Sequence, residues 1–142
     1  MKIDSIKDGI VLDHITAGRG MRIYQLLHLE ALDCPVAILK NVPSKKMGKK
    51  DIIKISDADL HLDFAVIGYV DPEITVNVIR DGACVEKKHV ELPEELENVI
   101  RCKNPRCITT TEQELPHIFR LADRHDGIYR CIYCDTKASR QL

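Results

Sequence analysis

In the first two thirds of the chain, the hydrophobic positions alternate between the short period of strands and the longer period of helices. A run rich in β-branched residues at 9–15 predicts a strand, and Gly18-Arg19-Gly20 separates it from a helical pattern at 21–32. The same patterns predict further strands at 36–42, 51–55, 75–80 and 83–90, a loop at 43–50 and a second helix at 62–70. This order is typical of a ferredoxin-like α+β fold, in which two helices cover one face of an antiparallel sheet.

The pattern changes at an acidic, proline-containing segment, Leu92-Pro93-Glu94-Glu95-Leu96-Glu97. Beyond it, His125-Asp126-Gly127 has the composition of a turn, and short β-prone runs occur at 108–111, 117–121 and 128–130. We therefore predict two domains, residues 1–92 and residues 93–142, of which the second is a small all-β domain.

Two pairs of cysteines lie in the second domain: Cys102 and Cys107 in a C-x4-C pair, and Cys131 and Cys134 in a C-x2-C pair. Tight turns of this kind aim two thiolates at one ion about 2.3 Å from each sulfur, and Asn104-Pro105 supplies turn chemistry to the longer loop. Four thiolates leave no coordination position open, so the pattern predicts a zinc ribbon with one structural Zn²⁺ per chain. Iron is the alternative, because a tetrahedral sulfur site accepts either metal.

The other two cysteines, Cys34 in an apolar run and Cys84 in a predicted strand, are most simply small buried hydrophobic residues. His117 and His125 lie between the cysteine pairs, but four thiolates already complete a tetrahedral sphere. The chain begins without the charged and then apolar segments of a secretion signal. We therefore expect a cytoplasmic protein with reduced thiols rather than disulfides.

Composition and charge narrow the function classes. The 142 residues include 21 lysines and arginines and 22 aspartates and glutamates, so the net charge of −1 provides no general attraction to nucleic acid. No apolar run approaches the roughly 20 residues of a membrane span. There is also no Walker loop, no GxGxxG motif and no nucleophile with a nearby base, so we expect no catalytic residue and no enzyme activity.

Two polar segments of the first domain are candidates for ligand binding. From Ser44 to Lys54 the chain carries five lysines and a single acid, Asp51, which favours a polyphosphate ligand, although a solvated lysine loop has the same composition. Asp13-His14 has the composition of an acid and base pair. Adjacent residues of a strand point to opposite faces, so we expect that these two side chains cannot easily act on one group.

Short strings along nearly the whole chain match one family in order and spacing: Ile6-Lys7-Asp8-Gly9, Leu12-Asp13-His14-Ile15, Pro43-Ser44, Met47-Gly48-Lys49-Lys50-Asp51, Ile53-Lys54-Ile55, Thr75-Val76-Asn77, Leu92-Pro93 and the four cysteines. On these residues the chain resembles the regulatory chains of aspartate carbamoyltransferase. The resemblance implies a non-catalytic subunit of the enzyme that commits carbamoyl phosphate and aspartate to pyrimidine biosynthesis. It further implies that the first domain binds CTP or ATP, that the zinc domain docks on the catalytic chain, and that regulatory homodimers form within a hetero-oligomer.

The resemblance also implies a nucleotide site. Its residues would be Ile3, Asp4, Ser5 and Ile6, which close over the base, together with Asp13, His14, Lys50, Lys54, Asn77, Ile79, Cys84 and Lys87. Lys87 matches a phosphate-contacting lysine, yet a two-residue turn at Asp81-Gly82 would direct it away from the face shared by Asn77, Ile79 and Cys84. A bulge or a longer turn would bring Lys87 back to that face.

A zinc ribbon that binds nucleic acid is the alternative function. Such a domain needs a basic face with exposed aromatic rings. The basic residues of the second domain are in excess, and they are Arg101, Lys103, Arg106, Arg120, Arg124, Arg130, Lys137 and Arg140. Only Phe119, Tyr129 and Tyr133 are aromatic, so we interpret the basic surface as a protein-docking surface and expect no nucleic acid partner.

Overall fold

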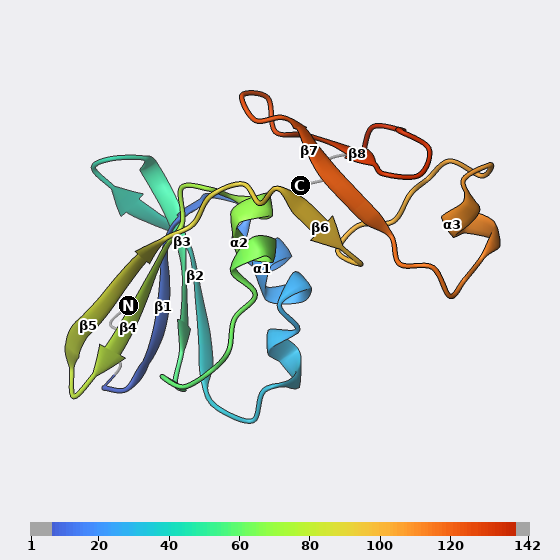
Figure 1. The fold of residues 1–142 in the computed structure, drawn as a ribbon. Coiled ribbons are helices and arrows are strands. Elements are labelled where there is room, and N and C mark those ends of the chain that lie inside the picture. Colours follow the sequence, from blue (N-terminus) through green and yellow to red (C-terminus); the bar gives the residue numbers. More distant parts are fainter. Residues whose placement is uncertain (1–6, 139–142) are drawn as a thin grey trace. The chain divides into compact units, whose positions relative to one another are not determined.

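The first unit of the chain is built on a five-stranded antiparallel sheet with the strand order β2-β3-β1-β4-β5 (Figure 1). The computed structural model describes residues 7–138 of the chain. The strands are β1 (Gly9–Thr16), β2 (Val36–Ser44), β3 (Gly48–Ile55), β4 (Thr75–Arg80) and β5 (Ala83–His89). Helices α1 (Gly20–Leu26) and α2 (Phe64–Val70) lie on one face of the sheet. The predicted ferredoxin-like α+β fold is thereby confirmed.

The core of this unit lies between the helices and the inner face of the sheet. Because successive strand residues point to opposite faces, every second residue of the central strands is buried there. These residues are Ile10, Leu12, Ile53, Ile55 and Val76, and they are covered by Ile23 of α1 and by Ile67 and Val70 of α2. Burying each such side chain stabilises the fold by roughly 1.5–3 kcal/mol. The outer face of the sheet remains available for polar residues.

The first helix is shorter than the sequence predicts. It ends at Leu26, and His28 adopts a left-handed backbone with a φ of 54° before a single 3-10 turn, η1 (Leu29–Ala31). The backbone N–H of His28 donates to the carbonyl oxygen of Gln25 at 3.1 Å, which closes the last turn. Hydrophobic residues continue past this break, so periodicity alone overestimated the length of the helix.

The predicted loop at 43–50 is instead the turn end of a β-hairpin formed by β2 and β3. Val42 pairs with Lys50 and Ser44 pairs with Gly48, so only residues 45–47 form the turn. Gly48 has a φ of 77°, a conformation that glycine adopts without strain, and the Ser44 hydroxyl oxygen accepts the N–H of Met47 at 3.2 Å. The lysine-rich segment is therefore an ordered hairpin.

Helix α2 is fixed at its start by a cap and in its middle by a close contact. The Asp63 carboxylate accepts the N–H groups of Ala65 at 3.0 Å and Val66 at 3.3 Å, which places the start of the helix two residues after the predicted one. A Cβ atom at Gly68 would lie 2.0 Å from the carbonyl oxygen of Glu91. Only glycine lets the segment after β5 approach the helix so closely.

The second unit begins after Glu91 and contains a three-stranded antiparallel sheet. Its strands are β6 (Glu95–Glu97), β7 (Ile118–Asp123) and β8 (Ile128–Cys131), in the order β6-β7-β8. Leu96, Phe119 and Tyr129 are buried in this unit, and the Tyr129 hydroxyl donates to the Pro93 carbonyl oxygen at 2.6 Å. The predicted small β domain is confirmed, with β6 as a strand that the sequence did not indicate.

One predicted strand of the second unit is a helix. Residues Ile108–Thr111 form the single turn α3, directly after Cys107. Two threonine hydroxyls bond to nearby carbonyl oxygens, Thr110 to Asn104 at 2.7 Å and Thr111 to Ile108 at 3.1 Å. These local bonds outweigh the β preference of the threonine run. Across the described part of the chain, none of the helices has the length and apolar character that a membrane crossing requires.

Candidate metal centre and ligand-binding face

Four cysteine thiols converge in the second unit. Cys102 and Cys107 flank the loop before α3, and Cys131 and Cys134 lie at the end of β8 and in the turn after it. Their sulfur atoms all lie within 4.8 Å of one another, with 3.5 Å between Cys102 and Cys134 and 3.7 Å between Cys107 and Cys131. Four sulfurs about 2.3 Å from one tetrahedral ion would be roughly 3.8 Å apart. The four thiols therefore fit a single metal ion.

Backbone turns hold each cysteine pair in place. In the first loop, the Asn104 side-chain oxygen accepts the N–H of Arg106 at 3.0 Å, and the N–H of Cys107 donates to the Asn104 carbonyl oxygen at 3.0 Å. In the second, the N–H of Asp135 donates to the Cys131 carbonyl oxygen at 2.8 Å, with Asp135 at a φ of 64°. Both turns are closed by hydrogen bonds within the chain, so the thiols are positioned by the fold itself.

Each pair also has hydrogen-bonding groups behind its sulfur atoms. Thr109 Oγ1 lies 3.1 Å from Cys107 Sγ, and Thr136 Oγ1 lies 3.1 Å from Cys134 Sγ. A metal-bound thiolate carries no proton, so in the loaded site each hydroxyl would donate to the sulfur. Such outer contacts orient ligands and spread their negative charge.

The thiols differ in acidity when no metal is bound. Burial raises the pKa of Cys102 to about 12 and also raises the pKa of Cys131. The Thr136 hydroxyl lowers the pKa of Cys134 to about 6. A metal ion must therefore displace protons from the buried thiols when it binds.

The outer face of the first sheet carries a row of residues from four strands. Lys54 of β3 pairs with Val11 of β1. Val11 pairs in turn with Asn77 of β4, which pairs with Lys87 of β5. Residues paired in this way share a face, and the Asn77 amide donates to the Val11 carbonyl oxygen at 3.3 Å. The row therefore has one lysine at each end, Lys54 and Lys87, with the Asn77 amide between them.

A β-bulge sets the direction of Lys87. Val78 pairs with Glu86 whereas Ile79 pairs with Cys84, so Val85 is an extra residue of β5. The insertion restores Lys87 to the face that Cys84 occupies. This is the irregularity that the sequence required if Lys87 was to join Asn77, Ile79 and Cys84.

A second bulge brings Asp13 and His14 to one side of the sheet. It lies in β1 between Leu12 and Ile15, and His14 has a φ of 59°. His14 Nδ1 lies 3.1 Å from Thr75 Oγ1, and Thr75 is the register partner of Asp13. The prediction that Asp13 and His14 point to opposite faces is therefore wrong, because the bulge interrupts the alternation on which it relied.

Asp13 is paired with one lysine of the hairpin. Its Oδ1 atom lies 2.9 Å from Lys50 Nζ. Burial raises the pKa of Asp13, but hydrogen bonds from the Lys50 ammonium and the His14 N–H together lower it by more, so the pKa lies below its usual value. Within residues 7–138, Lys54 and Lys87 have no acidic partner, so they supply the uncompensated positive charge of this face.

Comparison with known proteins covers both units. The model of the aspartate carbamoyltransferase regulatory chain allosteric domain matches residues 1–91, and that of the metal binding domain of the same chain matches residues 94–142. The regulatory chain of Clostridium tetani is 51% identical over 135 residues, which cover 95% of this chain and 94% of the relative. That of Bifidobacterium longum is 42% identical over 138 residues, which cover 97% and 99%. This chain belongs to the aspartate carbamoyltransferase regulatory chain family.

The family assignment confirms the resemblance predicted from the sequence. A regulatory chain is a non-catalytic subunit, in agreement with the prediction of no enzyme activity. The four-cysteine cluster lies in the part that matches the metal binding domain, so a metal ion is expected there. The sheet with its row of lysines lies in the part that matches the allosteric domain.

The residues that the sequence suggested for a nucleotide site lie on one face where the structure describes them. The outer face of the sheet carries Asp13, His14, Lys50, Lys54, Asn77, Ile79, Cys84 and Lys87. Cys84 is exposed and Cys34 is half-buried, so the prediction that both are buried is wrong. Ile3, Asp4, Ser5, Ile6 and Arg140 lie outside the described residues.

Sequence reasoning missed Thr75, which is buried on the same face between Asp13 and His89. A hydroxyl on an otherwise apolar strand start gives only a weak signal. The contact between Thr75 and His14 depends on the bulge in β1, which no local pattern of that strand indicates.

Proposed function

We propose that this regulatory chain binds CTP and ATP on the outer face of its first sheet and passes the effect to an aspartate carbamoyltransferase catalytic chain. The observation that carries the proposal is the row from Lys54 through Asn77 to Lys87, within the part that matches an allosteric domain. Two lysines without acidic partners suit a triphosphate, because each charge is free to pair with phosphate oxygens.

The remaining residues of the face would orient the nucleotide. The Asn77 amide donates one hydrogen to the Val11 carbonyl oxygen, and its oxygen accepts from Cys84 Sγ at 3.9 Å, which leaves its second hydrogen for base or ribose. Ile79 and Cys84 pair in register beside it and offer a less polar surface for the base. His14 lies near the lysine row and would approach the phosphates, whereas Lys50 is engaged with Asp13.

The metal in the second unit is proposed to be zinc with a structural role. Four thiolates form a closed tetrahedral set that leaves no position for substrate or water. The domain of residues 93–142 would then dock on the catalytic chain. The domain of residues 1–92 would bind the effectors and pair with a second regulatory chain, in a cytoplasmic hetero-oligomer of pyrimidine biosynthesis.

Regulation follows from differential binding. A nucleotide that binds the regulatory chain more tightly in one state of the assembly shifts the equilibrium toward that state by the difference in binding free energy. Couplings of about 1–3 kcal/mol are typical. CTP would favour the low-activity state and ATP the high-activity state, with both competing for one site.

Nucleotide titration of matched variants tests the proposal. Lys54→Gln/Lys87→Gln removes the two free charges of the row, while Lys45→Gln/Lys46→Gln removes two exposed charges from the hairpin turn. We expect calorimetry to show CTP and ATP binding weakened at least about tenfold by the first pair and less than about twofold by the second, at fixed ionic strength. Equal losses in both would mean that the phosphates are attracted by net charge and not held by the row.

Co-elution with the catalytic subunit from the same organism tests the second half of the proposal. Zinc-loaded chain should co-elute with that subunit, and CTP and ATP should shift the aspartate saturation curve in opposite directions. Nucleotide binding without co-elution would retain the effector site and reject the regulatory assembly.

The alternative of a nucleic-acid-binding ribbon is less favoured by the structure. Arg120 lies 2.9 Å from Asp135, and Arg124 is paired with Glu94. Arg130 donates to the Asp135 carbonyl oxygen at 3.0 Å. Three of the basic side chains that would face phosphates are thus already engaged within the domain.

A further inference from the structure

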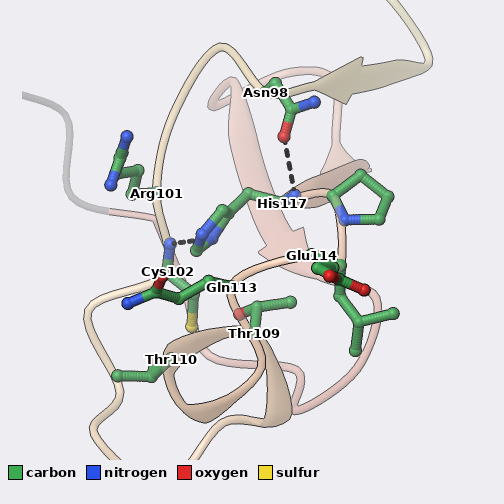
Figure 2. A pocket seen from close by; sticks show the side chains of 10 residues that line it. Asn98, Arg101, Cys102, Thr109, Thr110, Gln113, Glu114 and His117 are labelled. Atoms are coloured by element: carbon green, nitrogen blue, oxygen red, sulfur yellow. Dashed lines mark hydrogen bonds between the residues drawn. The ribbon is translucent and has the colours of Figure 1, made fainter.

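We propose that a polar cavity beside the metal centre receives an acidic side chain of the catalytic chain; this inference rests on the proposed function. The cavity measures about 650 Å³ and lies between α3 and the start of β7 (Figure 2). Asn98, Arg101, Gln113 and His117 line it, together with one acid, Glu114. Cys102, one of the four cysteines of the metal centre, also lines the cavity, whereas none of the residues of the nucleotide face does.

Hydrogen bonding fixes two donors in the cavity. The N–H of Cys102 donates to His117 Nδ1 at 3.2 Å, so the neutral imidazole carries its proton on Nε2. The N–H of His117 donates to the Asn98 side-chain oxygen at 2.9 Å, which leaves the Asn98 amide hydrogens to donate elsewhere. Figure 2 shows both bonds at the His117 side of the cavity. His117 Nδ1 and Asn98 Oδ1 thus accept hydrogen bonds from within the domain, while the His117 Nε2–H and the Asn98 amide hydrogens remain able to donate to a ligand.

Arg101 adds the charge that a carboxylate requires. It is exposed, and in the described part of the chain it forms no ion pair, in contrast to Arg120 and Arg124. A guanidinium offers parallel donors that match the two oxygens of a carboxylate. Arg101, the His117 Nε2–H, the Asn98 amide and the Gln113 amide thus bring several donors to one cavity that has a single acid of its own.

The surroundings of the cavity favour a protein side chain as its occupant. Ile108 opens the helix whose next residues line the cavity, and its side chain is exposed. Protein interfaces are enriched in arginine, and their fully buried core is more apolar than the rest of the surface. A free small anion would gain nothing from an exposed apolar side chain such as Ile108. An acidic residue on a protein surface would bring apolar neighbours that could pack against it.

The test compares two single arginine variants of the full-length chain. Arg101→Gln removes the free charge of the cavity, and Arg80→Gln removes the same charge from an exposed ion pair with Asp59 in the first unit. We expect Arg101→Gln to weaken association with the catalytic subunit at least about tenfold at physiological ionic strength, and Arg80→Gln less than about twofold. With Co²⁺ bound to the four cysteines as a spectroscopic probe, the thiolate-to-cobalt charge-transfer spectrum should be the same in both variants, since neither residue is a metal ligand.

The outcomes separate the inference from the proposed function. If Arg101→Gln associates as tightly as the unmodified chain, the inference is overturned while nucleotide regulation stands. If the unmodified chain does not associate with the catalytic subunit at all, the proposed function fails and the inference fails with it. Succinate titration of the isolated chain, followed by the NMR signals of His117, provides a further arm. Saturation below about 1 mM that depends on Arg101 would assign the cavity to a small carboxylate and reject the protein side chain.

Discussion

Each of the two units of this regulatory chain is stabilised by a different kind of interior. The first unit buries a continuous aliphatic layer between its sheet and helices, with Leu12, Ile53 and Ile67 fully inaccessible. The second has about fifty residues, and its buried side chains are mainly Leu96, Phe119, Tyr129 and three of the four cysteines. A domain this small rarely gains enough from its hydrophobic core alone. The comparison indicates that metal binding takes the place of a larger core in the second unit.

Metal removal should give the largest difference between the units. Apparent binding free energies of about 10–16 kcal/mol for structural zinc in small peptides exceed the roughly 5–9 kcal/mol that three large buried side chains contribute. We expect chelation, or Cys107→Ser, to abolish amide protection in β7 and β8 and to leave protection in β1 and β3 unchanged. Hydrogen exchange followed by mass spectrometry measures both regions in one sample. Retained protection in β7 after complete chelation would show that the second core is sufficient by itself.

Asp51 offers a matching test in the first unit. Its buried carboxylate accepts the N–H groups of Gly18 at 3.1 Å, Gly20 at 3.0 Å and Asn41 at 3.0 Å. Asp51→Ala would leave these donors without a partner, and we expect about 3 kcal/mol of destabilisation. Urea unfolding of the metal-loaded chain measures the loss of stability. The spectrum of Co²⁺ bound to the four cysteines should be unchanged, because Asp51 lies in the other unit. Asp63→Ala, which removes only the cap of α2, should cost about 1 kcal/mol.

Gly68→Ala isolates the close approach between α2 and Glu91. In an ordinary helix interior this substitution stabilises by about 1 kcal/mol, because alanine has the higher helix propensity. Here the new Cβ atom would lie 2.0 Å from the Glu91 carbonyl oxygen, so we expect destabilisation of about 1–3 kcal/mol. The sign of the change in urea midpoint is decisive, since a gain in stability would mean that the segment at Glu91 moves aside at little cost.

Thr109→Val tests whether the Thr109 hydroxyl strengthens metal binding by Cys107. The hydroxyl is buried and lies 3.1 Å from Cys107 Sγ, and valine preserves its shape while removing the donor. Outer contacts of this kind alter metal affinity about 10–100-fold. Competition with a chromogenic chelator should show faster zinc release from Thr109→Val than from Thr111→Val, whose hydroxyl bonds only the Ile108 carbonyl oxygen. Equal rates would indicate that the Thr109 hydroxyl does not act on the thiolate.

The sequence predicted most reliably what depends on local pattern. The strands with clear alternation, the hairpin at Asp81-Gly82 and the cysteine spacing all have local causes, and the structure contains each of them. Two of the errors came where a local change in the backbone interrupted a regular pattern. His28 ended α1, and the bulge at Asp13 and His14 reversed a side chain. A bulge depends on the register between strands, so neither strand specifies it alone.

The smallest expected effect concerns the pH response of the first unit. The pKa of Asp13 is lowered in the folded chain, so the carboxylate contributes stability that is fully present above its unfolded value of about 3.8 and is lost as pH falls through the lower folded value. The pair with Lys50 is partly exposed, so we expect no more than about 1 kcal/mol. Urea unfolding from pH 5.5 to 3.0, followed by the NMR methyl signals of Ile53, reports on the first unit even where acid releases the metal from the second. Asp13→Asn should unfold with a weaker pH dependence in this window than the unmodified chain, because it has no proton to gain. Identical pH profiles would assign the acid sensitivity of the first unit to other carboxylates and leave Asp13 as a purely local partner of Lys50.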